Sequence, residues 1–150
     1  MKTLHNTLVE LGKWLGEKAS LDSELFRLAE SHNGWFTEGS VKTALSVHAE
    51  SLNEKNLNLW LDAYSLSDGS VESNGKKLGL ITAGNLPLVG LHDILCGLVA
   101  GYDVVVKASR DDVVLPRAVV NALEEINPVL KGRITSVSYT HLTLPTNREV

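Results

Sequence analysis

The side chains best suited to chemistry lie in two short polar segments. These segments read Thr82-Ala83-Gly84-Asn85-Leu86-Pro87 and Lys107-Ala108-Ser109-Arg110. A fixed side-chain amide such as that of Asn85 can stabilise a developing oxyanion by about 3 kcal/mol. An ammonium group such as that of Lys107, at the end of a strand, can bind a phosphate or a ribose hydroxyl. Each residue also has a plainer interpretation, because Asn85 could cap a helix with Pro87 in its first turn and Lys107 could extend into solvent.

Strand and helix signals beside these segments predict how they are positioned. Leu78–Ile81 is a short apolar run and Tyr102–Ala108 contains three successive valines, so both favour a buried strand. Leu88–Ala100 is apolar at nearly every position, which predicts a buried crossover helix between parallel strands. Ligands of such sheets bind beyond the carboxyl ends of the strands. We therefore expect the segments that contain Asn85 and Lys107 to form one rim of a binding cleft.

The order of these signals resembles the aldehyde dehydrogenase superfamily. In that superfamily a small-residue loop that ends in Asn and is followed by Pro precedes the helix, and a Lys-Pro-Ser-Glu motif closes the second strand. The stretch from Gly84 to Ser109, GNLPLVGLHDILCGLVAGYDVVVKAS, is more similar to the acyl-CoA reductases related to the LuxC component of fatty-acid reductase. With the upstream Trp35-Phe36-Thr37 and Asn58-Leu59-Trp60-Leu61, the resemblance extends from about Trp35 to Arg133.

The resemblance implies a fold and an activity. The fold is an α/β, Rossmann-type nucleotide-binding domain of the aldehyde dehydrogenase kind, truncated here and preceded by a helical layer. The activity is NAD(P)H-dependent reduction of a long-chain fatty acyl-CoA thioester to the fatty aldehyde, through a cysteine acyl-enzyme. Asn85 matches the residue that stabilises the oxyanion. The expected cofactor-binding residues are Thr82, Ala83, Gly84, Lys107, Ser109 and Arg110, with Gly84 contributing backbone freedom or room for the ligand.

The second motif departs from the superfamily pattern, because the chain reads Lys-Ala-Ser-Arg in place of Lys-Pro-Ser-Glu. Relatives that prefer NAD use the carboxylate at this position to hold the ribose hydroxyls and to repel a 2′-phosphate. Arg110 instead offers a cation that could pair with that phosphate, so we expect NADP(H) to be preferred and NAD(H) to be possible. The alternative is a surface ion pair between Arg110 and Asp111 or Asp112.

The cysteine nucleophile is expected to lie outside this chain. Cys96 is the single cysteine and falls inside the predicted crossover helix, where a free thiol usually packs as a small hydrophobic group. His92 and Asp93 are adjacent on the same helix and point about 100° apart, so they do not form a dyad. One cysteine and no His-x-x-x-His spacing give no support to a metal site.

The rest of the chain divides into a helical region at 1–66, a connection at 67–77 and the first part of the nucleotide-binding domain at 78–136. Four amphipathic stripes are expected in the helical region: Leu4, Leu8, Leu11 and Leu15; Leu21, Leu25 and Leu28; Val41, Leu45, His48 and Leu52; and Leu57, Trp60, Leu61 and Tyr64. Ser40 is expected to open the third helix and Asn53-Glu54 the fourth.

After the second predicted strand, Asp111 or Asp112 should cap a further helix, with Pro116 in its first turn, and Asn127-Pro128 should end it. Gly132–Ser136 should begin a third parallel strand.

Residues 137–150 have a different character. Val137–Thr146 reads VSYTHLTLPT, which matches the translation of a transposon-end sequencing adapter in one reading frame. We therefore expect residues 137–150 to be a non-native tail, although a natural strand is the alternative. On this interpretation the native sequence is interrupted near Ser136, so we expect an unpaired strand edge and an uncovered sheet face.

Composition limits the classes of partner. The chain has 150 residues and a net charge of −4, which does not favour binding to nucleic acid or to an anionic membrane. There is no N-terminal apolar leader and no apolar run of membrane-spanning length, so a cytoplasmic location is expected. The expected partners are an acyl-CoA substrate and, for the full-length protein, further copies of itself or a fatty-acid reductase complex. The alternatives are another CoA-acylating aldehyde dehydrogenase, an acyl-phosphate reductase, or a non-catalytic α/β interaction module.

Overall fold

The computed structural model describes residues 2–66 and 71–137, and within them the chain is a mixed α/β protein. Its elements, in chain order, are α1 (Leu4–Leu21), α2 (Ser23–His32), α3 (Glu38–Ser51), α4 (Glu54–Ala63), β1 (Lys77–Ile81), α5 (Leu91–Val99), β2 (Asp103–Lys107), α6 (Val114–Ile126), the short 3-10 helix η1 (Pro128–Leu130) and β3 (Ile134–Ser136). The predicted tail at 137–150 lies outside the described residues except for Val137, and so do residues 67–70 of the predicted connection.

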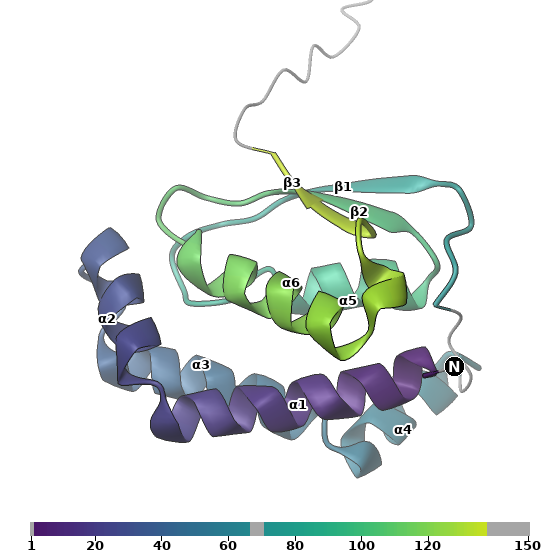
Figure 1. Cartoon of the computed structure of the whole chain (residues 1–150), viewed down its shortest axis with the longest axis horizontal. Helices are drawn as coiled ribbons and strands as arrows, with labels where there is room; N and C mark the ends of the chain where they lie inside the picture. The colour runs from purple at the N-terminus through teal and green to yellow at the C-terminus, as the bar shows by residue number, and fades with distance from the viewer. Residues whose placement is uncertain (1, 67–70, 138–150) are drawn as a thin grey trace, which may run out of the picture.

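The three described strands form a parallel sheet in the order β1-β2-β3, which confirms the predicted strand-helix-strand unit and the third parallel strand. Helices α5 and α6 cover one face of this sheet (Figure 1). Alternate residues of β2 point to that face, and its Val104 and Val106 are buried there. The opposite face is open, and Ile81 at the end of β1 is 68% exposed. The predicted uncovered face is therefore present in the described part of the chain.

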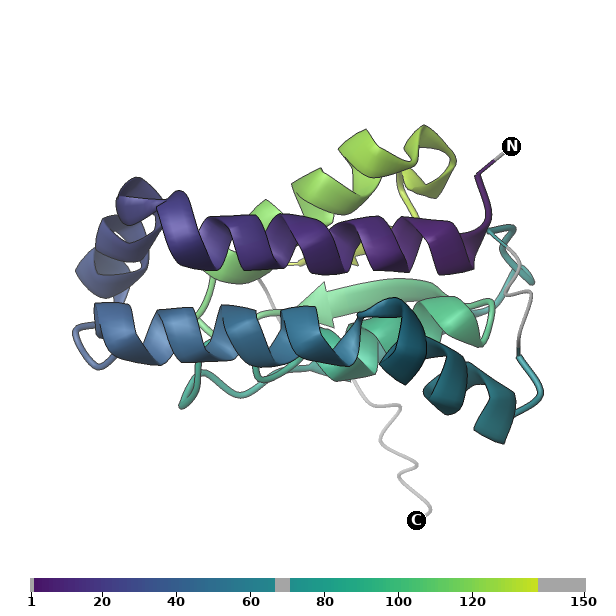
Figure 2. The ribbon, with the colours of Figure 1, turned by 90° about the horizontal axis from the view of Figure 1, so that it is seen from below.

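The N-terminal helices form a third layer beneath α5 and α6. Helices α1 and α3 lie side by side, as Figures 1 and 2 show, and α1 also contacts α6. The predicted leucine stripe of α1 is fully buried. Gly12 allows the close approach of α1 to the end of α3, because a Cβ at this position would lie 2.9 Å from the Cβ of Leu52. The helical layer and the α/β part consequently share one hydrophobic core.

The predicted stripe of α2 was wrong for Leu21 and Leu28, whereas Leu25 is partly buried and packs against the core. Leu21 and Leu28 are 82% and 44% exposed, whereas Phe26 and Ala29 are buried. Helix α1 continues to Leu21, and Asp22 then caps a new helix by accepting a hydrogen bond from the Leu25 N–H. The new helix begins at a different angle, so spacing counted from Leu21 does not apply to it.

Of the caps predicted for α3 and α4, the first was wrong and the second is confirmed. Thr37, and not Ser40, caps α3, and its side chain accepts a hydrogen bond from the Ser40 N–H. Asn53 caps α4 as predicted.

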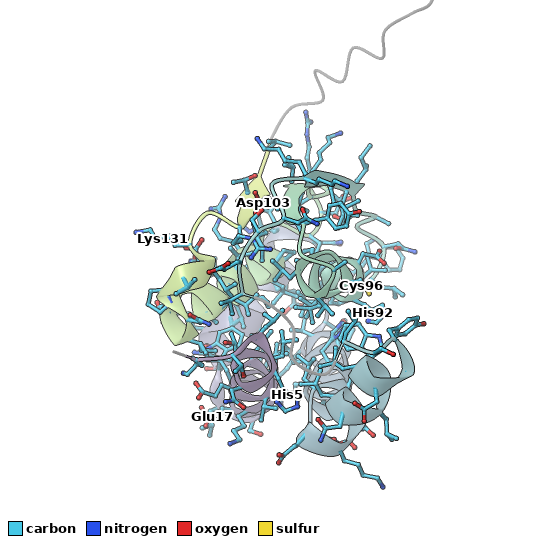
Figure 3. The ribbon with its side chains drawn as sticks, turned by 90° about the vertical axis from the view of Figure 1, so that its right-hand side faces the viewer. His5, Glu17, His92, Cys96, Asp103 and Lys131 are labelled. Atoms are coloured by element: carbon cyan, nitrogen blue, oxygen red, sulfur yellow. The ribbon has the colours of Figure 1, made fainter. Side chains whose placement is uncertain are left out.

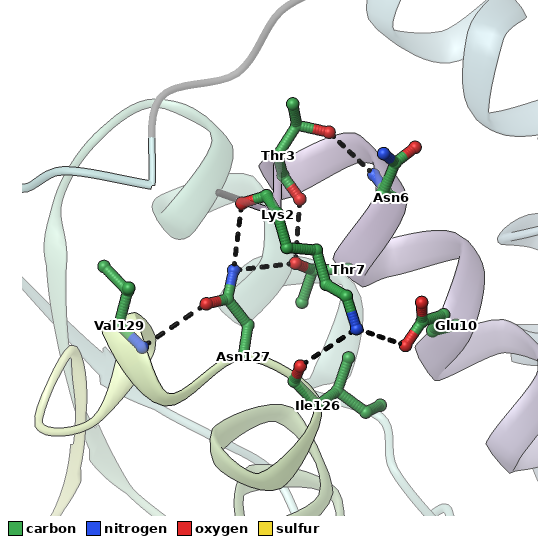
Figure 4. Close-up of polar contacts among 8 residues, drawn as sticks. All are labelled: Lys2, Thr3, Asn6, Thr7, Glu10, Ile126, Asn127 and Val129. Atoms are coloured by element: carbon green, nitrogen blue, oxygen red, sulfur yellow. Dashed lines mark hydrogen bonds and ion pairs between the residues drawn. The ribbon is translucent and has the colours of Figure 1, made fainter.

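Asn127 ties the end of α6 to the start of α1 (Figure 4). Its side-chain amide donates to Thr7 Oγ1 at 2.9 Å and to the Lys2 carbonyl at 3.3 Å, while its Oδ1 accepts from the Val129 N–H. Lys2 in turn donates from Nζ to Glu10 and to the Ile126 carbonyl. Asn127 also ends α6, as the sequence predicted, so one buried residue serves both as a helix terminus and as a link between layers.

Arg133 links several segments at the end of the sheet where the strands begin. The residue is 7% exposed, and its guanidinium donates to the carbonyls of Val71 and Tyr102. Its Nε lies 2.7 Å from Asp103 Oδ1, a contact that is an ion pair and not an aligned hydrogen bond. Arg133 is the residue before β3. It therefore joins the start of this strand to the start of β2 and to the segment that leads to β1.

Replacing Arg133 by Met should destabilise the protein. The change leaves the carbonyls of Val71 and Tyr102 without their donor, and each unsatisfied buried group costs about 1–3 kcal/mol. We expect the free energy of unfolding to fall by about 2–4 kcal/mol in urea denaturation. The exposed neighbour Lys131, replaced by Met, is the control and should change it by less than about 0.5 kcal/mol. Equal losses in the two variants would contradict this role of Arg133.

Candidate functional site

The two sequence-predicted segments meet at the carboxyl ends of β1 and β2. The Thr82 N–H donates to the Lys107 carbonyl at 3.1 Å, so hydrogen bonding between the strands continues one residue past β1. Two residues further on, Gly84 lies against Ser109, and a Cβ at Gly84 would be 2.3 Å from Ser109 Oγ. Glycine at position 84 therefore provides room for Ser109 of the neighbouring loop.

Asn85 is exposed at the tip of the loop between β1 and α5, and its side chain has no hydrogen-bond partner among the described residues. The predicted alternative, that Asn85 caps this helix with Pro87 in its first turn, is wrong. Helix α5 begins at Leu91, with Gly90 as the N-cap residue, and a tight turn over 87–90 separates it from Asn85. The amide is consequently free to bind a ligand.

Leu88 is a buried residue of this turn, and hydrogen bonds to its backbone N–H and to its carbonyl hold the turn in place. Its N–H donates to Asp112 Oδ2 at 2.8 Å, and its carbonyl accepts from His48 Nε2 at 3.2 Å. Leu88 has a φ of +56°, a left-handed conformation that is rare for a large side chain. Such a conformation persists only where the surroundings enforce it. The pairing with Asp112 and His48 supplies that constraint, and we call the three residues the Leu88 clamp.

Asp112 is the charged member of the Leu88 clamp. The predicted role of Asp111 or Asp112 as the cap of α6 was wrong, because α6 has Val113 at its N-cap position and no side-chain cap. Asp112 is 4% exposed, and its second oxygen, Oδ1, has no partner among the described residues. Burial raises the pKa of this carboxyl from 3.8 to about 6, and the hydrogen bond from Leu88 opposes part of that shift.

His48 and His92 lie near each other where α3, α4 and α5 meet. Burial lowers the pKa of His48, the hydrogen bond to Leu88 opposes this shift, and the proximity of His92 lowers the pKa further. The ring of His92 also contacts Trp60, with 5.4 Å between the ring centroids. His48 is therefore uncharged at neutral pH and acts as a hydrogen-bond donor to the turn.

Cys96 lies one helical turn from His92, and Figure 3 shows the two side chains on the same side of the molecule. Its Sγ is 3.5 Å from His92 Nε2. Burial, together with the nearby Asp93, raises the pKa of the Cys96 thiol. A thiol that stays protonated is a poor nucleophile, so this environment fits the predicted packing role of Cys96.

The remaining predicted cofactor residues occupy two sides of the sheet. Lys107 is in register with Ile81 and, by strand alternation, belongs to the open face. Thr82 belongs to the covered face, where its methyl group packs closely against Gly90. Arg110 and Ala83 are exposed. No described ion pair joins Arg110 to Asp111 or Asp112, so the alternative of a surface pair is not supported.

Comparison of the chain with protein-family models, with curated proteins and with solved structures finds no match. Within residues 2–66 and 71–137, no three His, Cys, Asp or Glu side chains are grouped so that they could hold a metal ion. The helices in the same ranges lack the length and apolar character needed to cross a membrane.

Sequence reasoning missed the roles of Asp112 and His48. His48 was assigned only to the buried stripe of α3, and Asp112 only to a cap or a surface pair. The sequence contains only a weak signal for the clamp. Asp112 is an acidic residue just before the apolar start of α6, and it lies 24 positions after Leu88 in the Leu-Val-Gly turn.

The pKa of Asp112 predicts a pH dependence of stability. The pKa is raised in the folded protein, so the folded state binds a proton more readily than the unfolded chain between about pH 4 and pH 6. Stability should therefore fall as the pH rises through this interval, by up to about 3 kcal/mol for a shift of this size. Asp112→Asn keeps an acceptor for Leu88 but cannot ionise, so its unfolding free energy should vary less over the same interval.

Denaturant titrations at pH 4, 5, 6 and 7 measure this effect. Asp111→Asn is the matched control, because Asp111 is exposed and should leave the wild-type pH profile unchanged. A profile of Asp112→Asn that runs parallel to that of the wild type would show that this carboxyl is not the buried titrating group.

Proposed function

We propose that this chain is the N-terminal part of a NAD(P)H-dependent acyl-CoA reductase, which reduces a long-chain fatty acyl-CoA thioester to the aldehyde. The observation that carries the proposal is the contact between the segment after β1 and the end of β2, where Thr82 bonds to Lys107 and Gly84 lies against Ser109. These are the residues on which the sequence resemblance to the aldehyde dehydrogenase superfamily rests. The sheet would then be the first half of a Rossmann-type nucleotide-binding domain, since β1, β2 and β3 follow one another with both crossovers on one face.

Asn85 would stabilise the oxyanion that forms when a thiolate attacks the thioester carbonyl. Its amide is exposed and without a hydrogen-bond partner among the described residues, which leaves both of its N–H groups available. Preorganisation is the second requirement for such a donor. The Leu88 clamp would contribute to it by holding the backbone three residues beyond Asn85 against two other elements. The nucleophile would be a cysteine outside this chain, in keeping with the raised pKa of Cys96.

Lys107 and Arg110 would bind the cofactor on the open face of the sheet. Lys107 reaches that face from the last residue of β2, where a ribose hydroxyl or phosphate would lie beyond the strand ends. Arg110 is exposed and unpaired within the described ranges, so its guanidinium is available to a 2′-phosphate. NADP(H) is therefore the proposed cofactor. The alternatives within enzymes are another CoA-acylating aldehyde dehydrogenase and an acyl-phosphate reductase, and no contact in the described residues favours either.

In the full-length reductase of this proposal, replacing Asn85 by Ala tests the catalytic role. Loss of one oxyanion donor should lower kcat for acyl-CoA reduction about 100-fold and leave KM nearly unchanged. Asn58→Ala is the matched control, because Asn58 is an exposed residue of α4 whose side chain, among the described residues, bonds only to His5. Unchanged kcat in Asn85→Ala, or activity that does not depend on any cysteine, would refute the proposal.

Replacing Arg110 by Asp tests the cofactor preference. Removing the cation and adding a carboxylate should lower kcat/KM with NADPH at least tenfold and should raise the ratio of NADH to NADPH activity. The measurement is initial-rate kinetics with both cofactors at a fixed acyl-CoA concentration. Wild-type activity with NADH that equals or exceeds activity with NADPH would show that Arg110 does not select the phosphate.

A further inference from the structure

A hollow of about 310 Å³ lies between α6 and the covered face of the sheet, beside β3. Pockets that bind small molecules begin at about this size. The hollow is on the side of the sheet opposite to Lys107, so it is distinct from the proposed cofactor site. Its apolar lining, which we call the floor, includes Ile94, Val106, Ala108, Val120 and Ile134.

Polar side chains line the hollow along α6 and at the end of β3. Arg117 is the fourth residue of α6, and Ser136 ends β3 near the same end of the hollow, because α6 and β3 run in opposite directions. Glu124 lies seven residues further along α6, about 10 Å away along the helix axis. Its Oε1 accepts a hydrogen bond from the Gly132 N–H, so this carboxylate already has a partner.

The charge of Arg117 has no such partner. Among the described residues Arg117 forms no ion pair, and it is exposed at the mouth of the hollow. An anion bound there would form charge-assisted hydrogen bonds with the guanidinium. An apolar chain attached to that anion would extend over the floor toward Glu124. Glu124 would repel a second anion, which excludes dicarboxylates that span the hollow.

We infer that the hollow between α6 and β3 binds a monocarboxylate with a medium-length apolar chain, the carboxylate on Arg117 and the chain over Val120 and Ile134. A chain of about eight carbons spans a length similar to the separation of Arg117 from Glu124. The inference rests on other residues than the proposed reductase site does, since it uses neither Asn85 nor Lys107.

A chain-length series tests the apolar floor. The probes are acetate, butanoate, hexanoate and octanoate, titrated into the full 150-residue chain and followed by calorimetry or by ¹H–¹⁵N NMR shifts. Each buried methylene should strengthen binding about fourfold, so octanoate should bind much more tightly than butanoate. Octanoate that binds no more tightly than acetate would overturn the inference.

Arg117→Gln tests the charged end of the hollow. Arg117 is exposed, so the variant should keep the wild-type melting temperature while its affinity for octanoate falls about tenfold. Octan-1-ol, which has the chain without the charge, should bind the wild type and the variant equally. The matched control is Arg27→Gln on α2, outside the hollow, which should bind octanoate as the wild type does. Equal octanoate affinity in Arg117→Gln and the wild type would overturn the assignment of the carboxylate to Arg117.

Discussion

The arrangement of the strand ends depends on the backbone of one buried leucine. Leu88 adopts a left-handed conformation, its N–H is bound by Asp112, and its carbonyl is bound by His48. Asp112 follows β2 and His48 belongs to α3, so the Leu88 clamp joins the loop after β1 to the loop after β2 and to the helical layer. The unusual backbone angle is stable because both of its polar groups are satisfied in a buried site.

This clamp has an energetic cost that the rest of the fold must offset. A buried carboxylate with one oxygen unpaired disfavours its own ionisation, which is why the pKa of Asp112 rises to about 6. The single core that extends from α1 to β3 supplies the opposing stabilisation. Asn127 and Arg133 reinforce that core at two other junctions, each by satisfying two backbone groups with one buried side chain.

The end of β2 separates two surfaces of different character. Lys107 on the open face and the exposed Arg110 in the loop after β2 offer positive charge where a nucleotide would lie in the proposed reductase. On the covered face, Ala108 and Val106 contribute to the apolar hollow beneath α6. Successive residues of a strand point to opposite faces, so one short strand serves both surfaces. The proposed cofactor site and the proposed carboxylate site can therefore be tested without affecting each other.

The sequence by itself determined the order and type of the elements. The leucine spacing of α1, the three valines of β2 and the apolar stretch that contains α5 are local patterns, and local periodicity is sufficient to select helix or strand. The same reasoning placed Lys107 and the loop that contains Asn85 at the same edge of the sheet, because parallel strands joined by a crossover helix run in one direction and have their carboxyl ends at one edge.

Only the tertiary structure decided where α5 begins, which face of α2 is buried and what Asp112 does. Leu88 is held by partners 24 and 40 positions away, and no local pattern encodes contacts between residues so far apart. The buried face of α2 likewise depends on the angle at which the chain turns after Leu21, which is fixed by packing against α3 and α6. Side-chain spacing thus determined each element, whereas long-range hydrogen bonds and packing determined how the elements meet.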